Sequence, residues 1–310
     1  VRSVAGPVAR SIRFDPYTPL FRDADVNTIV GRYWPVRLER GEPRMFATEP
    51  GVRVLGHCHW RHRGAPVAVL VHGLEGSIDS NYMKWTARAL LEAGFNVVRM
   101  NVRNCGGTEH LSPTLYHSGL TGDLRAVVEQ LGEIPMFLVG FSMGGNQVLK
   151  LAGEWGKSAP ARVRAICAIS TPIDLAACSR RLGEQRNRVY EVRFLRQLQA
   201  RLRRKVRLMP ERFSLAPLER VRSIIDFDHY VTAPAFGFRD AWDYYERSSA
   251  IGYLGAVRVP ALLIQARDDP FIPFSCFRLP DNPALELLDP EHGGHVSFLS
   301  RRRPRFWAGR

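Results

Sequence analysis

The sequence predicts an α/β fold, with a mostly parallel central sheet, helices on both of its faces and a helical cap inserted late in the chain. Between residues 66 and 170, short apolar runs rich in β-branched residues alternate with amphipathic stretches, as in buried parallel strands joined by crossover helices. The alternation breaks at 171–250, where the chain is helical, arginine-rich and aromatic, and the strand pattern resumes at 259. An insert there predicts a cap over the carboxyl ends of the strands, where open α/β sheets bind ligands.

The individual elements follow from the same pattern. Amphipathic stretches that end in glycine predict helices at 82–94 and 121–132, and a third helix is expected at 143–154. Upstream, residues 30–40 and 51–62 have the pattern of a hairpin that joins the edge of the sheet. Strands are expected at 66–73, 95–103, 135–141, 163–170, 259–270 and 284–290.

Length and composition fit one domain with an insert. The chain has 310 residues and 45% hydrophobic content, enough for one large core. We expect residues 1–170 to form the N-terminal part of the core, residues 171–250 the cap and residues 251–310 the C-terminal part of the core. The first 14 residues carry arginines where a signal peptide would be apolar, and the five cysteines are scattered. We therefore expect a soluble, cytoplasmic protein.

The chain is strongly basic, and the cap is its most basic part. The net charge is +14, and eleven lysines or arginines lie between Arg180 and Arg207. Such a field suits an anionic membrane surface, an acidic substrate or nucleic acid, but without a companion motif we expect no nucleic acid. A solvated outer face of the cap helix is the favoured interpretation. The alternative is that this basic face docks weakly on anionic membranes, which would make the protein peripheral to the membrane. That face would consist of Arg193, Arg196, Arg201, Arg203, Arg204 and Lys205.

The stretch GFSMGGNQVLK, residues 140–150, predicts a nucleophile. It follows a predicted strand and opens a predicted helix, the context of a Gly-x-Ser-x-Gly elbow. In such an elbow the serine lies in a sharp turn, and Gly140 and Gly144 let the chain pass closely. We therefore expect Ser142 to be a catalytic nucleophile.

A serine needs a base, and the base needs a carboxylate that holds its tautomer. In this architecture the acid and the histidine follow the serine along the chain. Asp268 and Asp269 both fit the acid, and Asp269 is preferred because Pro273 follows it by four positions. For the base, His295 is preferred to His292 because it follows two glycines on the loop after the last strand.

The developing oxyanion requires two backbone N–H donors. Met143, which follows the nucleophile, is expected to supply one, and Leu74 in the loop after the first core strand the other. His72 and Gly73, which precede Leu74, are expected to shape that loop.

Together these motifs resemble the YheT-like branch of the α/β-hydrolases, type 4 of that superfamily. HGLEGSIDSNYM, NVRNCGGTEHLSPTLYHSG, GFSMGGNQVLK, DDPFIP and HGGHVSF occur in the family's order between residues 27 and 298. The branch includes bacterial hydrolases, eukaryotic abhydrolase-domain lipases and yeast medium-chain ester synthase/esterases. The resemblance implies the α/β-hydrolase fold and cleavage of carboxylic esters, with Ser142, Asp269 and His295 at the family's catalytic positions.

Two other groups of residues suggest different chemistry. His57, His59 and His62 lie close together on a predicted strand, where alternate residues such as His57 and His59 share a face. No acidic or cysteine cluster completes a metal site, so we interpret them as part of an exposed strand. Cys105 lacks a base in sequence order, so it is not expected to be a nucleophile. We expect neither a metal nor a cofactor.

The sequence thus predicts a serine hydrolase that cleaves small-molecule or lipid esters through an acyl-enzyme on Ser142. An acyltransferase or ester synthase that uses the same acyl-enzyme is the alternative, because an alcohol can replace water in the second step. A binding protein that retains the fold without catalysis is the third hypothesis, against which the complete set of reactive residues argues.

Overall fold

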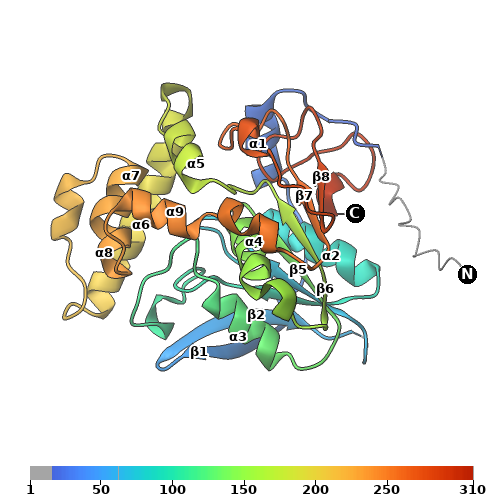
Figure 1. Ribbon diagram of the computed structural model, residues 1–310, viewed down its shortest axis with the longest axis horizontal. Coiled ribbons are helices and arrows are strands. Elements are labelled where there is room, and N and C mark those ends of the chain that lie inside the picture. Colours follow the sequence, from blue (N-terminus) through green and yellow to red (C-terminus); the bar gives the residue numbers. More distant parts are fainter. Residues whose placement is uncertain (1–15, 62, 310) are drawn as a thin grey trace, which may run out of the picture.

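The computed structural model describes residues 16–61 and 63–309 (Figure 1). The predictions made for the first 14 residues and for His62 lie outside the described residues. The α-helices are α1 (Ala24–Tyr33), α2 (Asn81–Glu92), α3 (Gly122–Gln130), α4 (Met143–Trp155), α5 (Leu175–Leu182), α6 (Arg188–Leu208), α7 (Ile224–Phe227), α8 (Ala233–Ala235) and α9 (Ala241–Ser248). The strands are β1 (Glu42–Glu49), β2 (Val52–His59), β3 (Val67–Val71), β4 (Asn96–Met100), β5 (Met136–Phe141), β6 (Val163–Ile169), β7 (Ala261–Ile264) and β8 (Leu285–Leu288).

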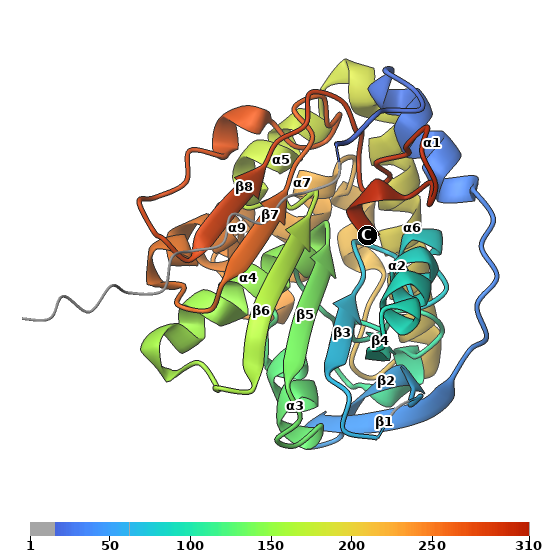
Figure 2. The same ribbon diagram turned by 90° about the vertical axis from the view of Figure 1, so that its right-hand side faces the viewer.

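The strands form one sheet in the order β1-β2-β4-β3-β5-β6-β7-β8. The six strands from β4 to β8 in this order are parallel, and β2 pairs antiparallel with both β1 and β4. In Figure 2 the arrows of β5 and β6 point toward the end of the molecule where α5 lies. The predicted architecture, a mostly parallel sheet with a helical cap, is confirmed.

Strand β3 explains how helices cover both faces of the sheet. All five of its residues are buried, and successive side chains enter opposite cores. Val67, Val69 and Val71 belong to the apolar cluster that includes residues of α3 and α4. Ala68 and Leu70 belong to a second cluster, with residues of α2. A continuous apolar run is therefore the sign of a strand that is buried on both faces.

The hairpin was predicted from residues 30–40 and 51–62, and the first of these two segments was wrong. Residues 30–33 end helix α1, and the strand that pairs with β2 is β1, which turns into β2 at Gly51. Helix α1 begins after Asp23, whose carboxylate accepts a hydrogen bond from the backbone N–H of Val26 at 2.8 Å. This N-cap satisfies one of the free N–H groups of the first turn, and it favours a helix over a strand here.

Between β6 and β7 the chain forms helices α5 to α9, the cap in Figure 1. One apolar cluster joins α6 to α7 and includes Leu115 of the core, and a second joins α5 to α9. Among residues 16–61 and 63–309, no helix is both long enough and apolar enough to cross a bilayer.

The prediction that Arg201 and Lys205 lie on the outer face of the cap helix was wrong. In α6 these two residues are 5% and 0% exposed, whereas Arg196 and Arg203 are exposed. Arg201 and Lys205 follow the buried Leu198 by three and seven residues, so the 3.6-residue period places them on the inner stripe. The Lys205 ammonium donates hydrogen bonds to two main-chain carbonyls of the core, those of Glu109 and Ser112.

The prediction of an exposed histidine strand was also wrong. His57 and His59 lie on β2 but are 8% and 9% exposed. The segment before β1 contacts His57, because the Arg40 carbonyl lies 2.9 Å from His57 Nδ1. The guanidinium of Arg99, on β4, lies 3.3 Å from His59 Nε2. Burial, together with the charge of Arg99, lowers the pKa of His59 to about 4. The part of the chain that is described holds no group of three metal-ligating side chains.

Candidate active site

Ser142 lies in the turn between β5 and α4, in a left-handed backbone conformation (φ 51°, ψ −121°). Residues with a Cβ rarely adopt this conformation. A Cβ at Gly140 would overlap the carbonyl oxygen of Gly144, and a Cβ at Gly144 would overlap that of Val71. Only glycine fits at both positions, so the spacing predicted from sequence corresponds to a physical requirement of the turn.

The structure brings Ser142, His295 and Asp269 together from three loops that follow β5, β8 and β7. His295 Nε2 lies 3.0 Å from Ser142 Oγ, and His295 Nδ1 lies 2.9 Å from Asp269 Oδ2. The Asp269 side chain is fully buried, and that of His295 is 10% exposed. A hydroxyl, an imidazole and a carboxylate in this order can transfer the serine proton to the imidazole.

The Asp269 carboxylate is held in place by donors from its own loop. Oδ1 accepts hydrogen bonds from the backbone N–H groups of Phe271 and Ile272, at 2.9 and 3.2 Å. Oδ2, which faces His295, also accepts one from the Gln265 side chain at 3.2 Å. These contacts fix the orientation of the carboxylate toward the imidazole.

Asp268 and His292, the alternatives for the acid and the base, pair with each other instead. Asp268 Oδ2 lies 3.3 Å from His292 Nδ1, and Asp268 Oδ1 accepts a hydrogen bond from the backbone N–H of Gly294 at 3.0 Å. Burial raises the pKa of the Asp268 carboxyl. Asp268 thus supports the glycine loop that precedes His295.

Helix α1 also supports the histidine loop, a contact that the sequence interpretation missed. The Thr28 hydroxyl accepts a hydrogen bond from the backbone N–H of His295 at 2.8 Å. The next residue, Val296, has φ 67°, and its N–H donates to the Ser170 hydroxyl at 2.9 Å. The N-cap residue Asp23, followed by an amphipathic stretch, was the sequence signal that could have identified the helix.

The loop after β3 lies against the elbow. A Cβ at Gly73 would come within 2.9 Å of Ser142 Cβ, and the Gly73 N–H donates to the Tyr82 hydroxyl at 3.0 Å. His72 is fully buried; its Nδ1 lies 2.8 Å from the Gly73 carbonyl, and its Nε2 accepts the Val102 N–H at 3.0 Å. Burial lowers the pKa of His72 to about 4, so this imidazole is neutral and links two loops.

The expected oxyanion donors belong to the elbow and to this loop. Met143 is the first residue of α4, so its N–H has no acceptor within the helix. Leu74 follows Gly73 and lines the cavities beside Ser142 and His295. These placements are compatible with the oxyanion role predicted for both residues.

Two cavities meet at the reactive residues. The narrow cavity, of about 130 Å³, lies beneath the cap and is lined mostly by apolar side chains, among them Leu115, Leu175, Leu198, Phe227 and Ile272. The wide cavity, of about 520 Å³, is lined by residues of α1, α2 and α6, among them Ile29, Arg32, Tyr82, Val189 and Arg193. Ser142 and His295 line both cavities.

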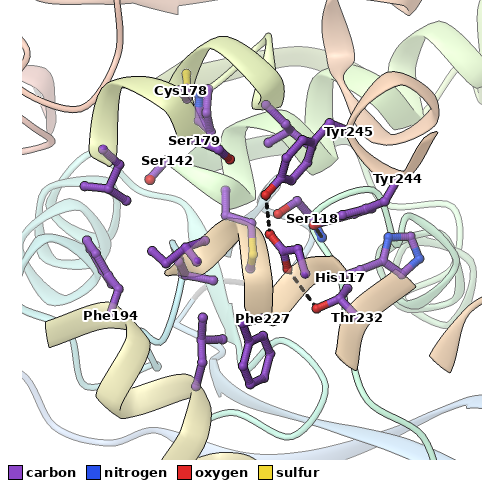
Figure 3. A pocket seen from close by; sticks show the side chains of 18 of the residues that line it. His117, Ser118, Ser142, Cys178, Ser179, Phe194, Phe227, Thr232, Tyr244 and Tyr245 are labelled. Carbon is purple, nitrogen blue, oxygen red and sulfur yellow. Dashed lines mark hydrogen bonds between the residues drawn. The ribbon is translucent and has the colours of Figure 1, made fainter. Parts of the chain in front are cut away.

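Figure 3 shows the narrow cavity from close by. Ser142 and Phe194 lie apart from Thr232 and Tyr245, and the space between them is bordered by residues of the core and of the cap. A substrate group bound there would contact both parts of the fold.

A buried ion pair joins the cap to the loop that carries Leu74. Arg201 donates two hydrogen bonds to the Glu75 carboxylate, at 2.9 and 2.7 Å, and both side chains are at most 6% exposed. The Tyr116 hydroxyl donates to the same carboxylate at 2.7 Å, and Arg201 also donates to the Asn104 carbonyl. Glu75 has φ 54°, so these contacts hold the residue next to Leu74 in a strained conformation.

Arg201→Ala is expected to lower the free energy of unfolding by about 3 kcal/mol or more, because it leaves the Glu75 carboxylate buried without a partner. We also expect kcat/KM for an ester to fall by at least about tenfold, because the loop next to Leu74 loses its support. Chemical denaturation and steady-state kinetics measure the two effects.

The matched control for this prediction is Arg203→Ala, two residues further along the same helix. Arg203 is exposed, and its guanidinium donates a long hydrogen bond of 3.5 Å to the Gln199 side chain. Loss of such an exposed contact is expected to change the free energy of unfolding by about 0.5 kcal/mol or less. Equal losses of stability in the two variants would contradict the role given to the buried pair.

Cys105 lies near this pair but is not suited to nucleophilic attack. Its side chain is fully buried, and burial raises the pKa of the thiol to about 12. A thiol rather than a thiolate is therefore present near neutral pH, and the thiol is a poor nucleophile.

Comparisons with known proteins agree with this geometry. A family model of the alpha/beta hydrolase fold matches residues 66–301. The chain is 36% identical over 252 residues to YheT of Escherichia coli (strain K12), whose name marks it as a candidate esterase, and the match covers 78% of this chain and 74% of YheT. It is 30% identical over 248 residues to the mouse phospholipase ABHD3, with 77% of this chain and 60% of that protein covered.

Among solved structures, an esterase of Pyrococcus furiosus, Pf2001, superposes with a TM-score of 0.54 at 18% identity, over 86% of this chain and 88% of that one. This likeness concerns the fold alone. The chain spans less than two thirds of the mouse phospholipase, so the mouse protein is longer than the matched part. From the family model and the identity to YheT together, the chain belongs to the α/β-hydrolase family, among its esterase-like and lipase-like members.

Proposed function

We propose that the protein is a serine hydrolase that cleaves carboxylic esters through an acyl-enzyme on Ser142. The observation that carries the proposal is the continuous contact from Ser142 Oγ through His295 to Asp269, at the place where the two cavities meet. A nucleophile, a base and an orienting acid in hydrogen-bond reach support acyl transfer as the class of reaction.

In the first step, Ser142 Oγ attacks the ester carbonyl carbon while His295 Nε2 takes the hydroxyl proton. Asp269 accepts the Nδ1–H bond, so Nε2 is the nitrogen that is free to accept the proton. The electron pair of the carbonyl bond moves to its oxygen, and the N–H groups of Leu74 and Met143 are proposed to stabilise that charge.

The tetrahedral intermediate then collapses. The carbon–oxygen bond to the alcohol breaks, the alcohol takes the proton from His295, and the acyl group stays on Ser142. Water attacks the acyl carbon in the second step, His295 accepts a proton from it, and the same proton returns to Ser142 Oγ as the acid leaves. The cycle regenerates the free serine and requires no cofactor.

The two cavities suggest where the two halves of the ester bind. The narrow cavity is lined mostly by apolar side chains, and apolar cavities of roughly this size take up small apolar molecules, so it suits the acyl chain. The wide cavity carries Arg32, Ser77 and Arg193 as well as apolar residues, and it suits the alcohol and its release. This division leaves both groups in contact with Ser142.

Transfer of the acyl group to an alcohol is the second candidate function. The wide cavity reaches Ser142 and has room for an acceptor alcohol while the acyl chain occupies the narrow one. A yeast medium-chain fatty acid ethyl ester synthase/esterase is 26% identical to this chain over 270 residues. Product analysis with an added alcohol distinguishes the two, because transfer yields a new ester and hydrolysis yields the free acid.

A fluorophosphonate probe and a p-nitrophenyl ester test the proposed function together. We expect the probe to label the protein covalently, and prior labelling to abolish release of p-nitrophenol. A protein that neither reacts with the probe nor hydrolyses any ester in a series of chain lengths would instead support a binding protein that retains the fold.

We also propose that the mouth of the wide cavity docks weakly on anionic lipid. Four apolar side chains at the mouth or next to it on α1 and α6 are exposed: Val26, Ile29, Tyr33 and Val189. Arg32, Arg193 and Arg196 come from the same two helices. Each basic residue near an anionic surface contributes about 1 kcal/mol, and the attraction falls off within a Debye length of about 10 Å at 0.1 M salt. The protein is therefore expected to bind anionic membranes weakly, and less tightly as the salt concentration rises.

Co-sedimentation with vesicles measures this docking. Arg196→Glu is expected to reduce binding to vesicles rich in anionic lipid at low salt. The matched control is Arg53→Glu, an exposed arginine of β2, a strand that does not line the wide cavity. Equal binding to neutral and anionic vesicles, or equal loss in both variants, would contradict the proposal.

A further inference from the structure

The narrow cavity contains a carboxyl group that the proposed mechanism does not use. Asp228 lines the cavity and begins a π-helical turn, Asp228–Thr232, in the cap. Turns of this kind are rare, and they often occur at functional sites. The lining of the cavity is otherwise mostly apolar and includes Leu198, Ile224 and Phe227.

Two hydroxyl groups of the cap orient this carboxyl. The Tyr245 hydroxyl donates to Oδ2 at 2.7 Å and the Thr232 hydroxyl to Oδ1 at 2.8 Å, the dashed lines of Figure 3. Each carboxylate oxygen can accept about two hydrogen bonds, so one position on each remains open. Among residues 16–61 and 63–309, no cation forms an ion pair with Asp228.

Two groups in the lining of the cavity could carry positive charge, Arg201 and His117, but neither is a counter-ion of Asp228. Arg201 lines the same cavity but is paired with Glu75. Burial lowers the pKa of His117, another lining residue, to about 3, so its imidazole is neutral. Burial likewise raises the pKa of Asp228 to about 6. A carboxyl in such surroundings is costly unless a hydrogen-bond donor meets it.

A purely structural role would not explain why Asp228 lines the cavity. Tyr245 and Thr232 tie Asp228 to α9 and to its own turn, yet the residue is not fully buried and lines the cavity that Ser142 lines. In Figure 3 its two partners lie apart from Ser142. An acyl chain attached to Ser142 that crosses the cavity would therefore meet Asp228 at a distance from the ester.

We propose that Asp228 is a specificity-determining residue that selects acyl groups with a hydroxyl remote from the ester. This inference rests on the proposed ester hydrolysis and adds the chemical class of the acyl group. A hydroxyl offers one donor to the open position of the carboxylate. An ammonium group would bring three donors into a largely apolar cavity, where those without an acceptor cost free energy.

Paired substrates test the inference on the unmodified protein. Each pair is a p-nitrophenyl ester of a straight-chain acid and the ester of the same acid with a terminal hydroxyl, over a series of chain lengths. A hydrogen bond to a charged group corresponds to about 10-fold or more in kcat/KM. We expect the hydroxyl ester to be preferred by roughly that factor at one or two adjacent lengths.

Two variants assign the preference to Asp228. In Asp228→Leu the preference is expected to reverse in favour of the plain ester, and in Asp228→Asn to shrink severalfold. The matched control is Asp226→Asn, whose carboxylate caps the neighbouring helix α7 through the N–H groups of Arg222 and Ser223 and does not line the cavity. The control is expected to keep the preference, and thermal unfolding checks that all three variants fold.

The possible outcomes separate this inference from the proposed function. No hydroxyl preference at any length in an active, unmodified protein would overturn the inference, as would a stronger preference for the corresponding amino-terminated ester. An unchanged preference in a folded Asp228→Leu variant would overturn it too. Absence of hydrolysis for all esters would instead overturn the proposed function on which the inference rests.

Discussion

Ser142→Ala is expected to reduce kcat for a p-nitrophenyl ester by about 10³-fold or more, while the protein remains folded. Nucleophile and base act as a unit, so removal of Oγ removes covalent catalysis and leaves only binding and oxyanion stabilisation. In the unmodified protein, Ser142 Oγ lies 3.0 Å from His295 Nε2, and the variant has no hydroxyl from which this imidazole could accept a proton. Steady-state kinetics on the purified variant measure the effect, with thermal unfolding as the check of folding.

Retention of more than about a tenth of the activity by Ser142→Ala would exclude Ser142 as the nucleophile. The paired histidines serve as a second control. His295→Ala should lose activity as severely as the serine variant. His292→Ala should lose much less, because His292 contacts Asp268 rather than Ser142.

Asp269→Asn is expected to reduce kcat by roughly 10³- to 10⁴-fold at neutral pH. The amide can donate to His295 Nδ1 and so favours the tautomer whose Nε2 carries a proton, which cannot accept the proton of Ser142. The matched control is the neighbouring Asp268→Asn, whose effect should be much milder because Asp268 supports Gly294 and His292.

The pH–rate profiles of the same two variants test the assignment of the acid a second time. If Asp269 orients the imidazole and stabilises its protonated form, the profile of Asp269→Asn should differ from that of the unmodified protein, and the profile of Asp268→Asn should not. Equal losses of kcat in the two variants would mean that the acid is shared, and would contradict the assignment drawn from the 2.9 Å contact of Asp269 with His295.

The parts of the fold that were predictable from sequence are those with a local physical cause. Strand β3 is buried on both faces, so its composition alone identifies it. The elbow was predictable because only glycine fits at Gly140 and Gly144. Asp269 and His295 were predictable because each lies on a loop after one of the last two strands. The structure adds the distance between their side chains.

The errors have physical causes as well. Residues 30–33 were assigned to a strand because their β-branched and aromatic residues outweighed the weaker signal of the N-cap at Asp23. Arg201 was placed outside because charged residues are almost never fully buried unless they are paired. The partner, Glu75, lies 126 positions away, and no local pattern announces such a distant pair.

Asp228 belongs neither with the correct predictions nor with the wrong ones, because nothing in the sequence predicted a role for it. It was not singled out by sequence, because a single aspartate in an aromatic, helical segment resembles a capping residue. Only the π-helical turn and the cavity give it a candidate role.

The cytoplasmic location of the protein, expected from the scattered cysteines and the arginines near the start of the sequence, stays a prediction.

The central claim is that Ser142 carries the acyl group of an ester during turnover. The most direct measurement is mass spectrometry of the protein, quenched in acid within the first turnovers of a p-nitrophenyl ester, followed by analysis of the peptide that spans residues 140–150. We predict a mass increase equal to the acyl group, located on Ser142 and lost when the ester is exhausted. Hydrolysis at full rate without any acyl adduct, or with the adduct on another residue, would contradict the account.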